Sequence, residues 1–187
     1  MESIDDVLLD ADDKMSKSVE FLHEQFAGLR TGKASPALVE NVKVMYYGTP
    51  TRLREIANIA TPEARLIVIN SYDPNALPEI EKAILAANLG VTPMNDGRVI
   101  RVPIPELNQE RRTELTKVAR RMAEEARVAI RNVRRDANEH IKTLQKNSKA
   151  TEDERDQSLV QIQKDTDTYI GKIDDILKAK EKDVMAV

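Results

Sequence analysis

The sequence has no cysteine and no tryptophan, and aromatic residues make up only 3% of its 187 positions. Without cysteine the chain has neither disulfides nor thiolate metal sites, which fits a reducing compartment. Few rings are present on which bases could stack, so any contact with nucleic acid should be with the backbone. The acidic N-terminus lacks the apolar segment of a secretory signal, and no stretch approaches the about 20 apolar residues that span a bilayer. We expect a cytoplasmic protein without membrane contact.

Signatures of catalysis are also incomplete. The segment from Gly28 to Ser35 resembles a phosphate-binding loop, but only three residues separate its glycines, and alanine stands where a magnesium-binding Ser or Thr belongs. His23 and Glu24 begin like a zinc-protease motif, but Ala27 takes the place of the second ligand. Two histidines leave little for a transition-metal site. The sequence therefore predicts no enzyme, no cofactor and no metal.

Proline is confined to one block of the chain. All eight prolines lie between Pro36 and Pro105, and the flanking segments have none. A shift in composition of this kind marks a domain boundary. The sequence therefore predicts two domains, one formed by residues 1–30 together with residues 106–187, and one formed by residues 31–105.

The proline-free flanks carry apolar residues at helical spacing. They predict three amphipathic helices of about 27, 40 and 35 residues, each with one apolar stripe to bury. Ser3 with Asp6, and Thr151 with Glu154, are predicted to cap the first and last of these helices. Packing the three stripes against one another gives a three-helix bundle. At about 1.5 Å per residue the middle helix would be about 60 Å long, so we expect an elongated domain.

The proline-rich block has a different pattern. Short apolar runs predict strands near residues 42–46, 64–70 and 99–104, and residues 74–88 predict a helix. This is typical of a small β/α/β domain inserted between the first two long helices, which makes the chain α+β. Two adjacent linkers would join it to the bundle, and they are expected to form a hinge. The hinge residues are Thr31, Gly32, Lys33, Val102, Pro103, Ile104 and Pro105.

Arginine is concentrated in the middle helix, although the formal charge of the chain is −3. Nine residues without an acid contain Arg127, Arg131, Arg134 and Arg135. At about 100° per residue, three of them and Arg120 fall on one flank of the apolar face. Residues 106–147 carry 11 basic and 7 acidic side chains, whereas residues 1–29 carry 2 and 8. The chain is electrically polarised.

Two interpretations of this arginine run stay open. A run of charge on a helix is usually a solvated face, and Asp136 and Glu139 could pair with Arg135 or Arg131. Arginine nevertheless has a planar donor fork that matches phosphate, and the centre of the run has no acidic partner at i, i+4. The second interpretation is therefore an interface with an RNA or DNA backbone.

Five segments, in order along nearly the whole chain, resemble bacterial ribosome recycling factors. They are Leu29 to Pro36, Tyr46 to Pro50, Ile100 to Pro105, Glu110 to Arg112 and Val128 to Asn138. The resemblance implies an L-shaped protein with a three-helix bundle and a hinged β/α/β domain. It also implies that, with elongation factor G and GTP, the chain splits post-termination ribosomes into subunits and releases mRNA and tRNA. The partner would hydrolyse the GTP.

The resemblance implies binding residues as well. The bundle would lie on large-subunit ribosomal RNA, with Arg134 as the principal anchor, Arg131 and Arg135 beside it, and Arg30 in the linker near RNA. Arg127 is expected to join them because it lies on the same flank of the helix. The expected state is a monomer, and the expected partners are the ribosome, its large-subunit RNA and elongation factor G.

Two other classes of function stay open. A ribosome-hibernation or structural RNA-binding protein would share the basic stripe but would act without a GTPase. A coiled-coil adaptor would use the apolar stripes between chains, although a simple rod has no use for the inserted domain.

Overall fold

The computed structural model describes residues 3–29 and 31–186, and these form two compact units. The first unit contains residues 1–26 and 114–187, and the second contains residues 27–113. Residues 27–30 and 106–113 thus group with the second unit, whereas the composition boundary put them in the first. The chain is of the α+β class, as the sequence predicted.

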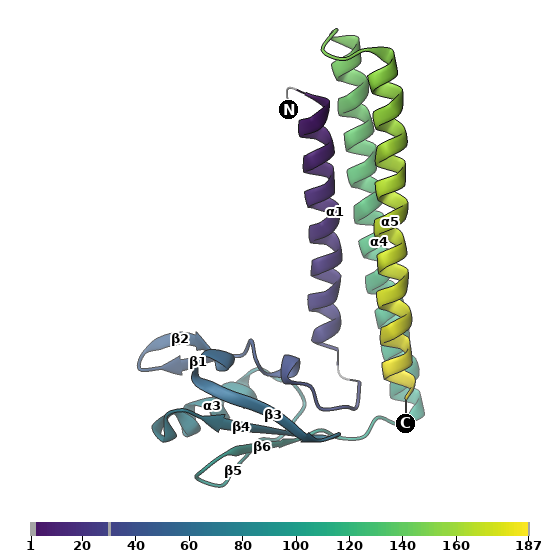
Figure 1. The fold of residues 1–187 in the computed structure, drawn as a ribbon. Helices are drawn as coiled ribbons and strands as arrows, with labels where there is room; N and C mark the ends of the chain where they lie inside the picture. Colours follow the sequence, from purple (N-terminus) through teal and green to yellow (C-terminus); the bar gives the residue numbers. More distant parts are fainter. Residues whose placement is uncertain (1–2, 30, 187) are drawn as a thin grey trace. The chain divides into compact units, whose positions relative to one another are not determined.

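The first unit is a bundle of three long helices (Figure 1), α1 (Ile4–Ala27), α4 (Gln109–Lys146) and α5 (Glu152–Met185). Their lengths of 24, 38 and 34 residues are close to the predicted ones. Both predicted caps are confirmed: the Asp6 N–H donates to Ser3 Oγ at 3.2 Å, and Thr151 and Glu154 form a reciprocal capping box. None of the helices in the described part of the chain is long and apolar enough to cross a membrane.

The bundle core is made of branched side chains from all three helices and of alanines from α4. On α4 the buried residues are Leu115, Ala119, Ala123, Ala126, Ile130, Ala137, Ile141 and Leu144. The predicted apolar face is therefore confirmed, except that Met122 and Val133 are only partly buried. Four of these eight residues are alanines, so the buried face of α4 is rich in small side chains.

A polar contact at the bundle surface joins α1 to α5. The Tyr169 hydroxyl donates to Asp12 Oδ1 at 2.6 Å, and Lys172 Nζ lies 4.7 Å from the centroid of the Tyr169 ring. The hydrogen bond to a carboxylate, together with partial burial, favours the neutral phenol and raises the pKa of Tyr169 from 10.0 to about 12. The contact thus holds only while the phenol keeps its proton.

The second unit contains two antiparallel sheets and one helix of more than one turn (Figure 1). A hairpin pairs β1 (Lys43–Tyr46) with β2 (Thr49–Arg52), and α2 (Leu53–Ile56) follows it. The larger sheet has the order β3-β4-β6-β5, formed by Ala57–Glu63, Leu66–Ser71, Ile100–Pro103 and Met94–Asn95. Between β4 and β5 lies α3 (Leu77–Ala86). The core of this unit includes Val44, Leu53, Ile67, Ile69, Ile80, Ile84, Ile100 and Val102, all fully buried.

The predicted strands near residues 42–46, 64–70 and 99–104 correspond to β1, β4 and β6, and the predicted helix to the 3-10 turn Pro74–Ala76 followed by α3. Three strands were missed. Pro50 and Pro62 lie inside β2 and β3, and proline is unfavourable in most strand positions, so these two segments have no clear strand pattern in the sequence. Both strands are edges of their sheets, where a missing N–H costs no pairing. Strand β5 has two residues and no pattern to detect.

Both linkers of the second unit are fastened to the turn between β3 and β4. The Ala34 N–H donates to the Ala64 carbonyl at 2.7 Å, and the Ile104 N–H donates to the Arg65 carbonyl at 2.8 Å. The Arg65 side chain also pairs with Glu106 at 2.7 Å. Gly32, with φ +78°, lies so close to the other linker that a Cβ there would be 3.2 Å from Leu107 Cγ. The two linkers therefore run side by side.

We predict that Tyr169 stays protonated at about pH 11, where an ordinary tyrosine is mostly ionised. Its folded pKa is raised, so the stabilisation by the Asp12 contact is complete below pH 10.0 and disappears between pH 10.0 and about 12. Spectrophotometric titration of the four tyrosines measures this directly. Asp12→Asn should bring the late phenol back toward the ordinary range, and Tyr169→Phe should remove it. The hydrogen bond to Asp73 also raises the pKa of Tyr47, so the Tyr169 signal is the difference between the two titrations, and a titration that Tyr169→Phe leaves unchanged at about pH 11 to 12 would contradict the prediction.

Candidate nucleic-acid interface

The predicted arginine run lies on α4, and the structure separates its members by exposure. The Arg127 side chain is 19% exposed and that of Arg131 is 39% exposed. Arg134 is half-buried and Arg135 is exposed. Arg127, Arg131 and Arg134 lie beside the alanine-rich buried face of α4. At such a position the aliphatic stem of an arginine can cover apolar atoms while its guanidinium stays at the edge.

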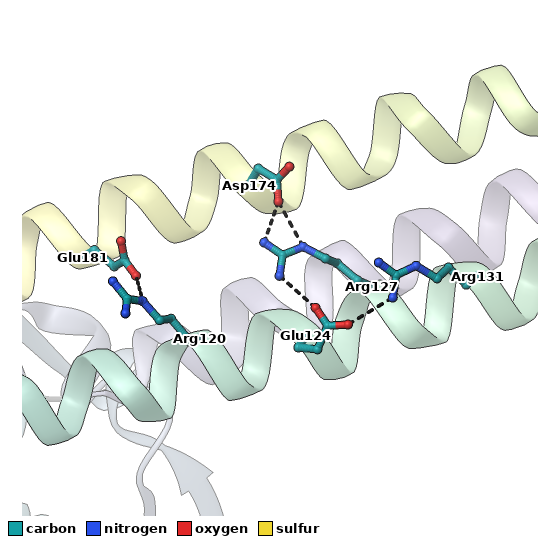
Figure 2. Close-up of polar contacts among 6 residues, drawn as sticks. All are labelled: Arg120, Glu124, Arg127, Arg131, Asp174 and Glu181. Carbon is teal, nitrogen blue, oxygen red and sulfur yellow. Dashed lines mark hydrogen bonds and ion pairs between the residues drawn. The ribbon is translucent and has the colours of Figure 1, made fainter.

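Arg127 is held by two carboxylates (Figure 2). Its Nε and Nη2 donate to Asp174 Oδ1 on α5 at 3.0 and 2.6 Å, and its Nη1 donates to Glu124 Oε2 at 3.1 Å. Partial burial opposes the charge, but the bonds to Asp174 and Glu124 outweigh it and raise the pKa of Arg127. Charge-assisted bonds of this kind are roughly twice as strong as neutral ones. Arg127 therefore joins α4 to α5 through its bonds to Asp174.

Glu124 also engages Arg131. Its Oε1 accepts from Arg131 Nη1 at 3.0 Å, so one carboxylate bridges two guanidinium groups (Figure 2). The hydrogen bond from Arg131, and then that from Arg127, lowers the pKa of Glu124 below its ordinary 4.5. Nearer the N-terminus of α4, Arg120 Nε donates to Glu181 Oε1 of α5 at 2.5 Å. Three of the arginines on this flank thus have a carboxylate partner.

In the part of the chain that the structure describes, the side chains of Arg134 and Arg135 have no carboxylate partner. Arg134 Nη1 donates to the side-chain amide oxygen of Gln163 on α5 at 3.2 Å, which orients the guanidinium without neutralising it. Within the described residues Arg135 has no hydrogen bond or ion pair, and neither Asp136 nor Glu139 pairs with an arginine of the run. The uncompensated positive charge therefore lies at the Arg134–Arg135 end.

Glu124, Asp174 and Gln163 were not predicted as partners of the arginines. The acidic partners expected from the sequence were Asp136 and Glu139, whereas Glu124 lies three residues before Arg127 and seven before Arg131. The i, i+3 spacing to Arg127 was visible in the sequence. Asp174 and Gln163 were not, because the register of α5 against α4 is a property of the packed bundle.

The predicted hinge residues fall into two groups in the second unit. Val102 and Pro103 belong to β6, where they pair with Ile67 and Leu66 of β4, and Ile104 is buried beside them. Thr31, Gly32, Lys33 and Pro105 lie outside strands and helices. Arg30, the predicted linker contact, lies outside the described residues.

Other chemistry finds little support in the part of the chain that the structure describes. No group of three or more His, Cys, Asp or Glu side chains there is placed to hold a metal ion. His140 is exposed, and His23 is likewise exposed on α1. The concentration of arginine on α4 thus remains the strongest functional feature.

A sequence profile described as ribosome recycling factor matches residues 22–185. The chain belongs to the ribosome recycling factor family. The ribosome-recycling factor of Carboxydothermus hydrogenoformans is 53% identical over 184 residues, which cover 98% of this chain and 100% of that protein. The resemblance seen in five sequence segments is thereby confirmed, and it assigns the chain to ribosome recycling, a step of translation.

Solved structures of ribosome recycling factors share the fold. A solution structure of such a factor matches with a TM-score of 0.83 and 44% identity, covering 98% of each chain. A second match has a TM-score of 0.70 and 42% identity, and covers 98% of this chain and 100% of that one. It is described as the T. thermophilus ribosome recycling factor and the E. coli elongation factor G bound to the E. coli post-termination complex.

We predict that Arg127→Ala lowers the free energy of unfolding of the bundle by about 1 kcal/mol, because three hydrogen bonds to carboxylates are lost. Urea unfolding followed by far-UV circular dichroism measures the change. Arg135→Ala is the matched control: it removes the same side chain from an exposed position of α4 and should change stability by less than about 0.5 kcal/mol. Equal stability of the two variants would mean that the Arg127 contacts contribute nothing.

Proposed function

We propose that this family member splits post-termination ribosomes into subunits, together with elongation factor G and GTP, and releases mRNA and tRNA. Family membership supports the recycling role. The similar factor in the complex with elongation factor G and a post-termination ribosome supports the choice of partners. In this proposal initiation factor three then keeps the subunits apart, and the chain acts as a cytoplasmic monomer.

The proposed RNA contact is centred on Arg134 and Arg135, against phosphates of large-subunit ribosomal RNA. The observation that carries it is the lack of a carboxylate partner on these two guanidinium groups, within the described residues, while Arg120, Arg127 and Arg131 each have one. A phosphate that binds Arg134 need displace only a neutral amide. Arg131 is a secondary contact, because its guanidinium already pairs with Glu124, the carboxylate that also accepts from Arg127. Arg127 contributes chiefly by fixing the two helices, and Arg30 is a proposed contact from the linker.

The proposed hinge is narrower than the sequence suggested. Hydrogen bonds to Ala64 and Arg65 hold Ala34 and Ile104 to the second unit, so bending should occur on the bundle side of these two residues. That leaves Thr31 to Lys33 in one linker and Pro105 with the following residues in the other. Glycine at position 32 accommodates a positive φ without strain, which suits a segment that must bend.

The chain itself is proposed to supply position and force rather than chemistry. Its nearest approach to a nucleotide-binding loop, Gly28 to Ser35, lacks the spacing and the magnesium ligand. GTP hydrolysis would belong to elongation factor G. A stiff helical bundle anchored on RNA at one end would then pass the movement of that GTPase to contacts between the ribosomal subunits.

Subunit splitting tests the proposal directly. Light scattering of post-termination ribosomes should fall only when the chain, elongation factor G and GTP are all present. The GTPase must come from a compatible species. Tight ribosome binding with no splitting under any condition would instead favour a hibernation protein. A molecular mass that rises with concentration would contradict the monomer and favour a coiled-coil adaptor.

We predict that Arg134→Ala weakens binding to isolated large subunits by about tenfold or more and reduces the salt dependence by about one phosphate contact. Helicity should not change, because the side chain lies off the core. Arg127→Lys keeps the positive charge at a position that Glu124 and Asp174 already neutralise. This variant should bind within about threefold of the unaltered chain. Binding of Arg134→Ala that equals wild type would remove Arg134 as the anchor.

A further inference from the structure

The arginines of α4 that face α5 follow a regular register. Arg120 meets Glu181 and Arg127 meets Asp174, so a step of seven residues forward on α4 corresponds to seven residues backward on α5. This is the pattern of two antiparallel helices with a coiled-coil-like contact. The next step leads to Arg134 on α4 and to Asp167 on α5. A third ion pair would be expected there.

The structure has a different arrangement at this third position. Arg134 Nη1 donates to Gln163 Oε1 at 3.2 Å, and Gln163 Nε2 donates to Asp167 Oδ1 at 2.8 Å. Within the described residues no ion pair joins Arg134 to Asp167. The amide of Gln163 lies between the two charged groups and bonds to both. It is one turn of α5 away from Asp167, at the i, i+4 spacing that lets such side chains meet.

The bonding pattern also determines which way the amide faces. Its NH₂ group donates to the carboxylate, so its oxygen is left to accept from the guanidinium. The reversed amide would place two donors against a guanidinium and an oxygen against a carboxylate, and neither contact would be a hydrogen bond. Asp167 therefore orients Gln163, and Gln163 in turn orients Arg134.

We propose that Gln163 is a positioning residue for RNA binding: it occupies the carboxylate of Asp167 and so keeps Arg134 both oriented and uncompensated. The proposal rests on the proposed function, in which Arg134 binds ribosomal RNA. It explains why Arg134 bonds to an amide, although Arg120 and Arg127 at equivalent positions of the register each form an ion pair. A phosphate that approaches Arg134 then competes with one neutral hydrogen bond and not with an ion pair. The neutral hydrogen bond is the weaker of the two.

The surroundings leave room for the ligand. Gln163 and Asp167 are exposed on α5, as are Val160, Lys164 and Thr168 on the same face of the helix, so this face is open to a ligand. Arg134 uses Nη1 for Gln163, and its other N–H groups face no carboxylate within the described residues. Gln163 thus fixes one side of the guanidinium and leaves the rest of the fork for phosphate.

The test is a set of variants measured for binding to isolated large ribosomal subunits at low ionic strength. Gln163→Ala releases Asp167, which then pairs with Arg134, so binding should weaken about three- to fivefold, the range expected for an exposed ion pair. Gln163→Ala combined with Asp167→Asn should recover wild-type affinity to within about twofold, because the competing carboxylate is gone. Asp167→Asn alone should bind within about twofold of wild type, because the new side-chain oxygen can still accept from Gln163 Nε2 and keep the amide oriented.

Gln161 supplies a matched control on the same helix. Its Nε2 donates to Asp165 Oδ1 at 2.7 Å, the same i, i+4 contact, and among the described residues no arginine donates to its amide oxygen. Gln161→Ala should leave binding unchanged. Circular dichroism of all variants should show the same helicity, since these side chains are exposed.

The outcomes separate the two proposals. If Arg134→Ala weakens binding but Gln163→Ala does not, or if Asp167→Asn fails to restore it, Gln163 has no positioning role and the RNA site stands. If Arg134→Ala itself binds as wild type, the proposed anchor fails and the role of Gln163 fails with it. An equal loss in Gln161→Ala would show a general effect of the α5 surface and would overturn the positioning role.

Discussion

The contact between α4 and α5 governs the surface properties of the bundle. Buried apolar residues of α4 hold it in the bundle core, and this packing sets the register of α4 against α5. Once the register is set, each long polar side chain at the edge of the contact has a determined neighbour. Arg120 meets Glu181, Arg127 meets Asp174, and Arg134 meets Gln163. The charge that the surface offers to a partner is thus decided by the core beneath it.

In the proposed function, an acidic chain binds a polyanion at one place. The formal charge of −3 opposes nonspecific attraction to nucleic acid. Arginines neutralised by Glu124 and Asp174 contribute stability, while the less compensated pair at Arg134 and Arg135 provides a local field. Binding confined to a short part of a helix fixes orientation better than binding spread over its whole length.

The second unit shows a complementary division between rigid and adjustable parts. Its two linkers are tied to the β3–β4 turn by main-chain hydrogen bonds, and the sheet extends through Val102 and Pro103 to the start of the second linker. Val102 and Pro103, which were predicted to belong to a hinge, are therefore part of the sheet. Proline here ends a strand whose last N–H is not required, a role that composition alone does not distinguish from a stiff linker.

The sequence by itself determined the elements whose cause is local. Apolar spacing predicted the three long helices, Ser3 and Thr151 predicted two helix starts, and the confinement of proline predicted an inserted unit. The flank of α4 that carries the arginines also followed from the helical repeat alone. These features depend on residues within a few turns of one another, so they can be read along the chain.

Only the tertiary structure decided which arginines keep their charge available. The residues of α5 that face these arginines lie dozens of residues away in the sequence; they are Gln163, Asp167, Asp174 and Glu181. A shift of one turn between the helices would bring the carboxylate of Asp167 to Arg134 in place of the amide of Gln163. The paired strands β2, β3 and β5 likewise required their neighbours, because proline-containing edges and a two-residue strand have no pattern of their own. Contacts between distant segments are set by packing, which a linear pattern does not contain.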